Sequence, residues 1–189
     1  SPLSVGPVQL KNRIFSTGHM TVMLENGVPS DAMVAYHKAR AKGGAGLIIL
    51  EAARAHASGV SGRPAIRAFE DACIPGYRRI AEACHPFECK VFAQLSHPGR
   101  EMPQAVDGTL AVAVAPSSIP NERFHVMPRK MPIAQIKDIV AGFEAAAGRI
   151  RQAGLDGIEL VASHGYLVAQ FFNPRVNVRM DEYGGTLEN

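Results

Sequence analysis

The sequence of 189 residues has no long apolar run, no cluster of basic residues and no recognisable leader. No apolar run approaches the ~18 residues that cross a membrane, and residues 1–4 have neither the charged nor the apolar region of a signal peptide. The net charge is only +3. Because the basic residues lie beside apolar helical positions, they indicate solvated helix faces rather than a nucleic-acid surface. These absences predict a cytoplasmic protein with no nucleic-acid or membrane partner.

Cysteine is scarce as well. Cys73, Cys84 and Cys89 are an odd number, and no pair has the spacing of a metal site. Cys84 falls on an apolar helical stripe and Cys89 directly precedes an apolar run, so both are expected in the core. A reducing compartment fits this pattern, and no metal site is predicted.

Short apolar runs alternate with amphipathic stretches along the chain. The runs predict strands at 14–15, 46–50, 91–95 and 158–161, because each is short and uniformly apolar. Ser30 is expected to cap a helix that ends at Gly43, and Pro75 suits the first turn of a second helix. A further helical turn is expected to start at Gly165. A third helix, ended by Gly154, is predicted from one apolar stripe: Ile136, Ile139, Val140, Phe143, Ala147 and Ile150.

This order predicts an α/β fold with buried parallel strands. A (β/α)8 TIM barrel and a doubly wound open sheet both fit it. No Gly-x-Gly-x-x-Gly follows a strand, since residues 43–46 precede one, and this disfavours the doubly wound fold. A barrel typically needs ~250 residues. Residues 1–189 are therefore interpreted as a fragment, the N-terminal half of a barrel with roughly its first four strand-helix units.

Polar residues close the predicted strands, where a barrel keeps its chemistry. Thr17, Gly18 and His19 follow the first strand; small residues there let backbone groups approach a flat ligand, although a plain turn explains them equally well. Glu51 closes the second strand. It either accepts a hydrogen bond from a ligand or, in the favoured interpretation, pairs with an arginine such as Arg54.

Further candidates follow the third and fourth strands. Gln94 lies inside an apolar run, and a buried amide without partners costs ~1–3 kcal/mol. It can satisfy a donor and an acceptor of a pyrimidine-like ring edge, or it is a core glutamine bonded to backbone. His164 and Tyr166 offer an acid-base group and a phenol, although the pair alone is also consistent with a structural role. Residues 96–130 contain five prolines and interrupt the pattern as an active-site loop would.

Several motifs occur together in a known order. They are Leu10-Lys11-Asn12-Arg13-Ile14, residues 94–100, residues 164–167, Gln170-Phe171, Asn173-Pro174, Asn177, Arg179 and residues 181–189. In this combination the chain resembles the Old Yellow Enzyme or NADH:flavin oxidoreductase family. It is most similar to the branch with 2,4-dienoyl-CoA reductase and trimethylamine dehydrogenase, and the resemblance covers nearly the whole chain.

The resemblance implies a barrel that holds non-covalent FMN. Gln94 would bind the flavin pyrimidine, while Thr17, Gly18 and His19 line its ring system and Glu51 and Ala52 lie near it. His164 would bind substrate, and Tyr166 would donate a proton. NADH or NADPH would supply electrons, and some relatives carry an iron-sulfur cluster and FAD after the barrel.

The sequence also departs from its relatives. Val161 stands where the reductases have a His, the first member of the substrate-binding pair whose second member is His164 here, and where trimethylamine dehydrogenase has a Tyr. Met20 replaces that enzyme's flavin-bonding Cys, and Ala52 replaces a Tyr of its amine cage.

Two reactions of a small organic substrate therefore remain open. One is reduction of an activated C=C bond; the other, slightly favoured, is oxidative N-demethylation or dehydrogenation of an N-methyl amine. The alternative of another class is a catalytically inert half barrel that lacks the flavin phosphate site and assembles through its open strand edges, for example as a homo-oligomer.

Overall fold

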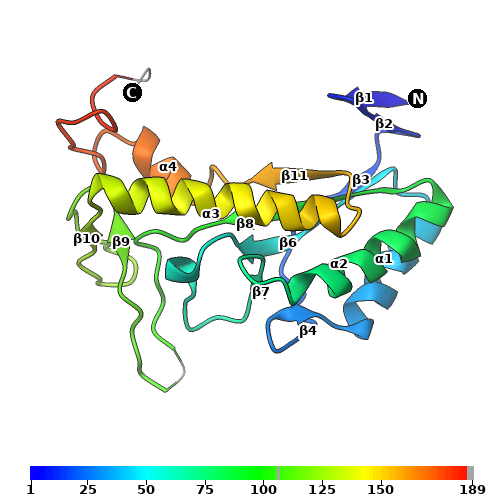
Figure 1. The fold of residues 1–189 in the computed structure, drawn as a ribbon, viewed down its shortest axis with the longest axis horizontal. Coiled ribbons are helices and arrows are strands. Elements are labelled where there is room, and N and C mark those ends of the chain that lie inside the picture. Colours follow the sequence, from blue (N-terminus) through cyan, green and yellow to red (C-terminus); the bar gives the residue numbers. More distant parts are fainter. Residues whose placement is uncertain (106, 187–189) are drawn as a thin grey trace.

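The computed structural model describes residues 1–105 and 107–186 (Figure 1). Its main sheet is parallel and contains β3 (Phe15–Ser16), β6 (Leu47–Arg54), β8 (Lys90–Ser96) and β11 (Gly157–Leu160), with β7 (Ile66–Arg67) beside the end of β6. Each strand pairs with the next one along the chain, in the order β3-β6-β8-β11. Because the order never reverses, the sheet winds as a barrel does and not as a doubly wound sheet.

Helices α1 (Asp31–Lys42), α2 (Cys73–Cys84) and α3 (Ile133–Gln152) connect these strands as predicted. The Ser30 side chain accepts a hydrogen bond from the Met33 N–H, which confirms the predicted cap of α1. The shorter elements are β1 (Leu3–Val5), β2 (Val8–Leu10), β4 (Leu24–Glu25), β5 (Val28–Pro29), η1 (Ala57–Gly59), η2 (His85–Phe87), β9 (Val114–Ala115), β10 (Arg129–Lys130) and α4 (Leu167–Phe172).

The main core lies between the sheet and the three helices. Ile48 and Leu50 of β6 face Met33 of α1, Tyr77 of α2 and Ile150 of α3, all of them essentially inaccessible to solvent. Each such side chain contributes ~1.5–3 kcal/mol by leaving water. All three cysteines are buried free thiols, which confirms the core positions predicted for Cys84 and Cys89.

The opposite face of the sheet is covered at one end only. Leu47, Ile49 and Phe92 pack there against Leu10, which belongs to the antiparallel hairpin β1–β2. This hairpin closes the amino ends of the strands. Functional side chains on this face are therefore expected at the carboxyl ends.

Four sequence-based predictions need correction. Strands β3 and β11 are not buried, because each has one neighbour in the sheet: Phe15 is 52% exposed and Leu160 is 53% exposed. Val140 is 60% exposed although it was assigned to the buried stripe of α3. Helix α4 begins at Leu167 rather than Gly165, because Gly165 has a positive φ of 71° that a right-handed helix does not accept. Strand β6 extends four residues past Leu50, through Arg54, because β7 and β8 pair with it there.

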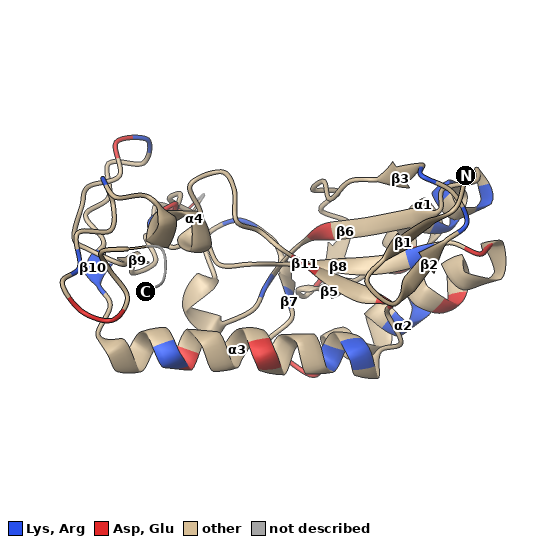
Figure 2. Cartoon of the chain, turned by 90° about the horizontal axis from the view of Figure 1, so that it is seen from above, with Lys and Arg blue, Asp and Glu red and all other residues tan. Residues whose placement is uncertain are grey.

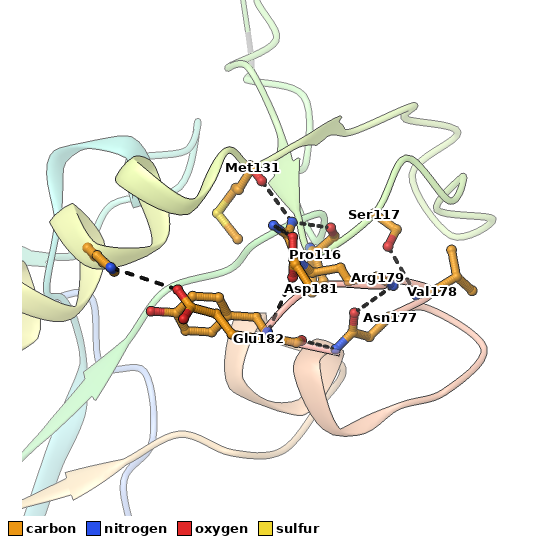
Figure 3. A network of polar contacts seen from close by, with 10 residues as sticks. Pro116, Ser117, Met131, Asn177, Val178, Arg179, Asp181 and Glu182 are labelled. Carbon is orange, nitrogen blue, oxygen red and sulfur yellow. Dashed lines mark hydrogen bonds and ion pairs between the residues drawn. The ribbon is translucent and has the colours of Figure 1, made fainter. Parts of the chain in front are cut away.

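The proline-rich loop is tied to the end of the described chain by Arg179 (Figure 3). This buried side chain donates to the backbone oxygens of Pro116 and Met131 and forms a two-pronged ion pair with Asp181. The Arg179 hydrogen bonds lower the pKa of Asp181. A Cβ on Gly184 would overlap the Arg179 backbone, so glycine is required there. Arg179, Asp181 and Gly184, which belong to the motifs of the family resemblance, thus have structural roles; residues 187–189 lie outside the described part.

Positively and negatively charged residues are interspersed rather than clustered, and Figure 2 shows both kinds along α3. Within residues 1–105 and 107–186, no helix is long and apolar enough to cross a membrane. The same residues contain no group of three or more His, Cys, Asp or Glu side chains placed to hold a metal ion.

Candidate active site

The segment that follows β3 lies against β6 and β8, and we call this place the strand-end site. Gly18 follows β3 and fits so closely against Gln94 of β8 that an added Cβ would lie 2.6 Å from the Gln94 Nε2 atom. The same Cβ would lie 3.0 Å from the backbone oxygen of Leu50 on β6. Only glycine keeps the backbone this close to the amide, so the three strand ends form a shallow cradle.

Glu51 organises the loop after β3 and does not pair with Arg54, contrary to the favoured interpretation. One of its carboxylate oxygens, Oε2, accepts hydrogen bonds from the N–H groups of Thr21 and Val22 at 2.7 and 3.3 Å and from the Thr21 hydroxyl. The other, Oε1, is buried without a partner among the described residues. Glu51 therefore holds the segment that carries Thr17, Gly18 and His19, and has acceptor capacity left.

Gln94 bonds to a side chain and not to backbone. Its Nε2 donates to the carboxylate of Glu159 on the neighbouring strand β11, a partner that the sequence patterns did not identify. Gln94 Oε1 has no hydrogen-bond partner in the described structure. The amide is half-buried, and its Nε2 and Cδ atoms are the ones nearest Gly18.

The remaining residues predicted to line the ring lie on the same side of the sheet. Thr17 is exposed, and its backbone oxygen accepts from His19 Nδ1 at 2.9 Å. Since Nδ1 is then the protonated nitrogen, His19 Nε2 accepts from the Tyr36 hydroxyl at 2.6 Å. The His19 side chain thus points toward α1, so that only the His19 backbone remains to line the strand-end site. Ala52 is half-buried and in register with Gln94.

His164 and Tyr166 follow β11 on the neighbouring strand end. Their ring centroids are 5.9 Å apart, and His164 Nδ1 lies 2.7 Å from the Ser163 hydroxyl. His164 adopts a positive φ of 57°, an unusual backbone conformation that places an exposed imidazole at the tip of the turn. Tyr166 is half-buried and lines a cavity of about 50 Å³ together with Arg54 and Glu101.

A buried network supports this turn from behind. The Leu167 N–H donates to the backbone oxygen of His97, and Gln170 bridges the backbone oxygens of Pro98 and Gly165. His97 Nδ1 accepts from the Gly99 N–H at 3.0 Å. Burial, followed by nearby cations, lowers the pKa of His97 to about 3. His97 is thus a neutral residue whose hydrogen bonds hold the backbone behind the turn.

Arg54 is the residue that sequence reasoning assigned wrongly. It is 9% exposed and its guanidinium donates to the Ser96 hydroxyl at 2.8 Å, while Nε is buried without a partner. An arginine that continues an apolar strand needs a hydrogen-bond partner from outside that strand, and this requirement could have identified Arg54 as a candidate site residue.

The strand-end site offers a closely approached backbone and free hydrogen-bond acceptors, which a flavin ring needs. The Gly18 cradle would be filled by any Cβ, Gln94 offers an unpaired amide oxygen, and Glu51 retains an unpaired carboxylate oxygen. A closely approached backbone beside an amide with an unpaired acceptor suits a planar ring with alternating donors and acceptors. The residues present therefore fit FMN.

Comparison with known proteins gives consistent results. A family model described as the NADH:flavin oxidoreductase / NADH oxidase family matches residues 1–189. The metal reductase of Desulforamulus reducens is 39% identical over 188 residues, which are 100% of this chain and 28% of that protein. The NADPH dehydrogenase of Listeria monocytogenes is 37% identical over 184 residues, 96% of this chain and 53% of that protein.

Solved structures agree with the sequence relatives. The Old Yellow Enzyme homologue from Zymomonas mobilis superposes with a TM-score of 0.88 at 32% identity, over all of this chain and 55% of that one. Morphinone reductase in complex with tetrahydroNAD gives a TM-score of 0.89 at 29% identity, over 100% of this chain and 56% of that one. The chain thus spans about half the length of these barrels, and it belongs to the NADH:flavin oxidoreductase / NADH oxidase family.

Proposed function

We propose that the protein is an FMN enzyme that accepts electrons from NADH or NADPH and reduces an activated C=C bond of a small organic substrate. The observation that carries this proposal is the shared location of two features. The Gly18–Gln94 cradle and the His164–Tyr166 turn both lie at the carboxyl ends of neighbouring parallel strands. That end of a barrel is where catalysis takes place in enzymes of this fold.

Each residue then has a distinct task. FMN, when bound, supplies the hydride that adds to one carbon of the double bond. Gln94 and the backbone at Gly18 hold and orient the ring, and Glu51 keeps the loop after β3 in place. His164 binds the electron-withdrawing group of the substrate. Tyr166 gives its hydroxyl proton to the other carbon and regains a proton from solvent, so the substrate gains two hydrogens.

The activities of related proteins support a reductase. Relatives that are 37–39% identical to the chain include a metal reductase, an NADH oxidase and an NADPH dehydrogenase. A solved relative binds tetrahydroNAD. Because the chain matches only 28% of the metal reductase and the NADH oxidase, we include in the proposal an iron-sulfur and FAD region after the barrel, as in the 2,4-dienoyl-CoA reductase branch.

Oxidative N-demethylation is the second candidate. Val161 supports it, because this buried side chain cannot bind a carbonyl oxygen where the reductases use the first His of the pair. In that reaction an N-methyl group of the substrate would lose a hydride to bound FMN, and water would then release formaldehyde and the demethylated amine. His164 and Tyr166 would position the amine.

Anaerobic assays separate the two candidates. We expect the FMN-loaded protein to oxidise NADH or NADPH when 2-cyclohexenone is present, and Tyr166→Phe to lower that turnover at least tenfold. Formaldehyde release from sarcosine with an artificial electron acceptor, without enone reduction, would establish the second candidate instead. Protein that keeps no FMN and performs neither reaction would favour the inert half barrel.

A further inference from the structure

Arg54 is a buried cation without a buried anion. The hydrogen bond from Nη1 to the Ser96 hydroxyl is the one that its side chain makes among the described residues. Its Nε is inaccessible and without a partner, and none of the ion pairs in the described part of the chain includes Arg54. Keeping an unpaired guanidinium out of water is costly, so a structural role alone does not explain it.

Additional positive charge surrounds Arg54. Arg63 and Ser61 line, with Arg54, both a cavity of about 300 Å³ and the adjoining cavity of about 50 Å³. Arg67 lines the larger cavity and pairs with Glu70 at 3.6 Å. Burial, and then the nearby Arg63, lower the pKa of Arg54, while Tyr166 acts in the opposite direction.

The one carboxylate that lines these cavities is already engaged. Glu101 borders the smaller cavity together with Arg123, and its Oε1 accepts from the Asn121 amide at 2.5 Å. No ion pair within 4.0 Å joins Glu101 to an arginine in the described residues. The cavities therefore have an excess of positive charge.

The location of Arg54 relates it to the proposed chemistry. Ala52 is in register with Gln94, and Arg54 is in register with Ser96. Because side chains two residues apart on a strand share a face, Arg54 lies one step beyond Gln94 toward the carboxyl end of the sheet. It also shares the smaller cavity with Tyr166. A ligand that contacts Arg54 is thus beside the proton donor.

We infer that Arg54, Ser61 and Arg63 bind the carboxylate of a small anionic substrate whose reacting carbon lies beside Tyr166. This inference rests on the proposed function and narrows it to acids, either a 2-enoic acid or an N-methyl amino acid. Arg54 lines both cavities, and its guanidinium supplies charge-assisted N–H donors of the kind that a carboxylate prefers. Ser61 adds a hydroxyl donor and Arg63 adds charge at the cavity mouth.

Calorimetric titration of the FMN-loaded protein tests the inference through binding alone. The probes are two matched pairs, crotonate with crotonamide and sarcosine with sarcosinamide. We expect at least one carboxylate to bind roughly tenfold or more tightly than its amide, since charge-assisted bonds replace neutral ones. Equal affinity within both pairs, or no measurable binding of either acid, would overturn the inference.

Variants locate the binding. Arg54→Gln removes the buried charge and should abolish the preference for the acid, whereas Arg54→Lys should retain part of it. Arg63→Gln should weaken acid binding less than Arg54→Gln does. Arg151→Gln, on the exposed end of α3, is the matched control and should bind like the wild type. An unchanged acid preference in Arg54→Gln would refute the assignment.

Two further measurements, of melting temperature and of turnover, distinguish a loss of acid binding from unfolding and from a failure of the proposed reaction. Arg54→Gln should melt no lower than the wild type, because it relieves an unpaired buried charge; a large fall would mean a structural role. Acid binding without any NADH or NADPH oxidation would disprove the proposed reaction but retain the anion site. Equal turnover of enones with and without a carboxylate would retain the reaction and disprove the anion site.

Discussion

Gly18→Ala tests the flavin cradle more specifically than removal of any polar group. The added Cβ would lie 2.6 Å from Gln94 Nε2, whereas ordinary contacts begin near 3.4 Å, so the amide must retreat by 3.4 − 2.6 = 0.8 Å or more. The other close atom is the Leu50 oxygen at 3.0 Å, which belongs to a paired strand and cannot yield. Gly18 does not have a positive φ, so alanine itself adds no backbone strain.

The expected cost follows from the contact that is lost. Displacing the Gln94 amide removes about one hydrogen bond to the ring, or ~1–3 kcal/mol, which corresponds to a roughly 5- to 150-fold weaker FMN complex. Quenching of FMN fluorescence on titration measures this affinity, and urea unfolding checks that the variant is folded. Gly148→Ala is the control, because no atom lies within 4 Å of its added Cβ.

Equal FMN affinities of the wild type and Gly18→Ala would refute the claim that the Gly18–Gln94 cradle holds the flavin. If Gly18→Ala does not fold, Gln94→Ala provides the same test without the steric clash. The Gly148→Ala control should bind FMN normally and be more stable by ~0.5–1 kcal/mol, because alanine replaces glycine inside a helix.

Three predictions concern stability and reactivity. Burial lowers the pKa of His37 to about 4, and both ring nitrogens lack partners, so His37→Leu should reduce the loss of unfolding free energy between pH 7.5 and pH 5 by about 2 kcal/mol in urea titrations. Gly99→Ala should cost ~2–4 kcal/mol in the same assay, because Gly99 has a φ of 62° and an added Cβ would overlap the Gln170 amide. Burial raises the pKa of the three cysteine thiols to about 11 or 12, so a disulfide reagent at pH 8 should label them only after unfolding.

The sign of the pH effect follows from proton uptake. A histidine whose pKa is depressed by folding binds its proton more readily in the unfolded chain. It therefore stabilises the fold above pH 6.5, and that stability is lost as the pH falls toward the folded-state pKa of about 4. His97, with a folded pKa of about 3, contributes in the same direction and remains in the variant. Stability that does not fall toward pH 5 would contradict the assignment.

The predictions for Gly99→Ala and for the cysteine thiols can each be contradicted by one result. A stable Gly99→Ala protein would mean that the loop behind Tyr166 can rearrange at little cost. Rapid labelling of even one thiol in the folded protein would mean that the core between sheet and helices opens readily.

Local signals in the sequence were sufficient for helices α1, α2 and α3 and for the four strands β3, β6, β8 and β11, but not for the short hairpins and paired strands around them. The Ser30 cap, the position of Pro75 and the apolar spacing of α3 act within one or two turns of chain, so they predict helices without tertiary information. Strand order was also accessible, since helices that link short apolar runs favour parallel neighbours. Val140 shows the limit, because the periodicity of α3 cannot reveal where the helix passes beyond the cover of other residues.

The site was harder to predict because its partners are distant in sequence. Gln94 is held by Glu159, and Glu51 by Thr21 and Val22, separations of 29 to 65 residues that no spacing rule covers. The expected pairing of Glu51 with Arg54 used proximity along the chain. Three residues along a strand is an odd spacing that directs side chains to opposite faces, and this rule disfavours the pair.

The measurement that tests the central claim most directly is rapid mixing of the NADPH-reduced, FMN-loaded protein with an activated alkene, for wild type and Tyr166→Phe. We expect the variant to be reduced by NADPH at the wild-type rate and to pass electrons to the alkene at least tenfold more slowly, because only the second step needs the phenol proton. Equal rates of alkene reduction in the two proteins would contradict the placement of the reaction at the ends of these strands.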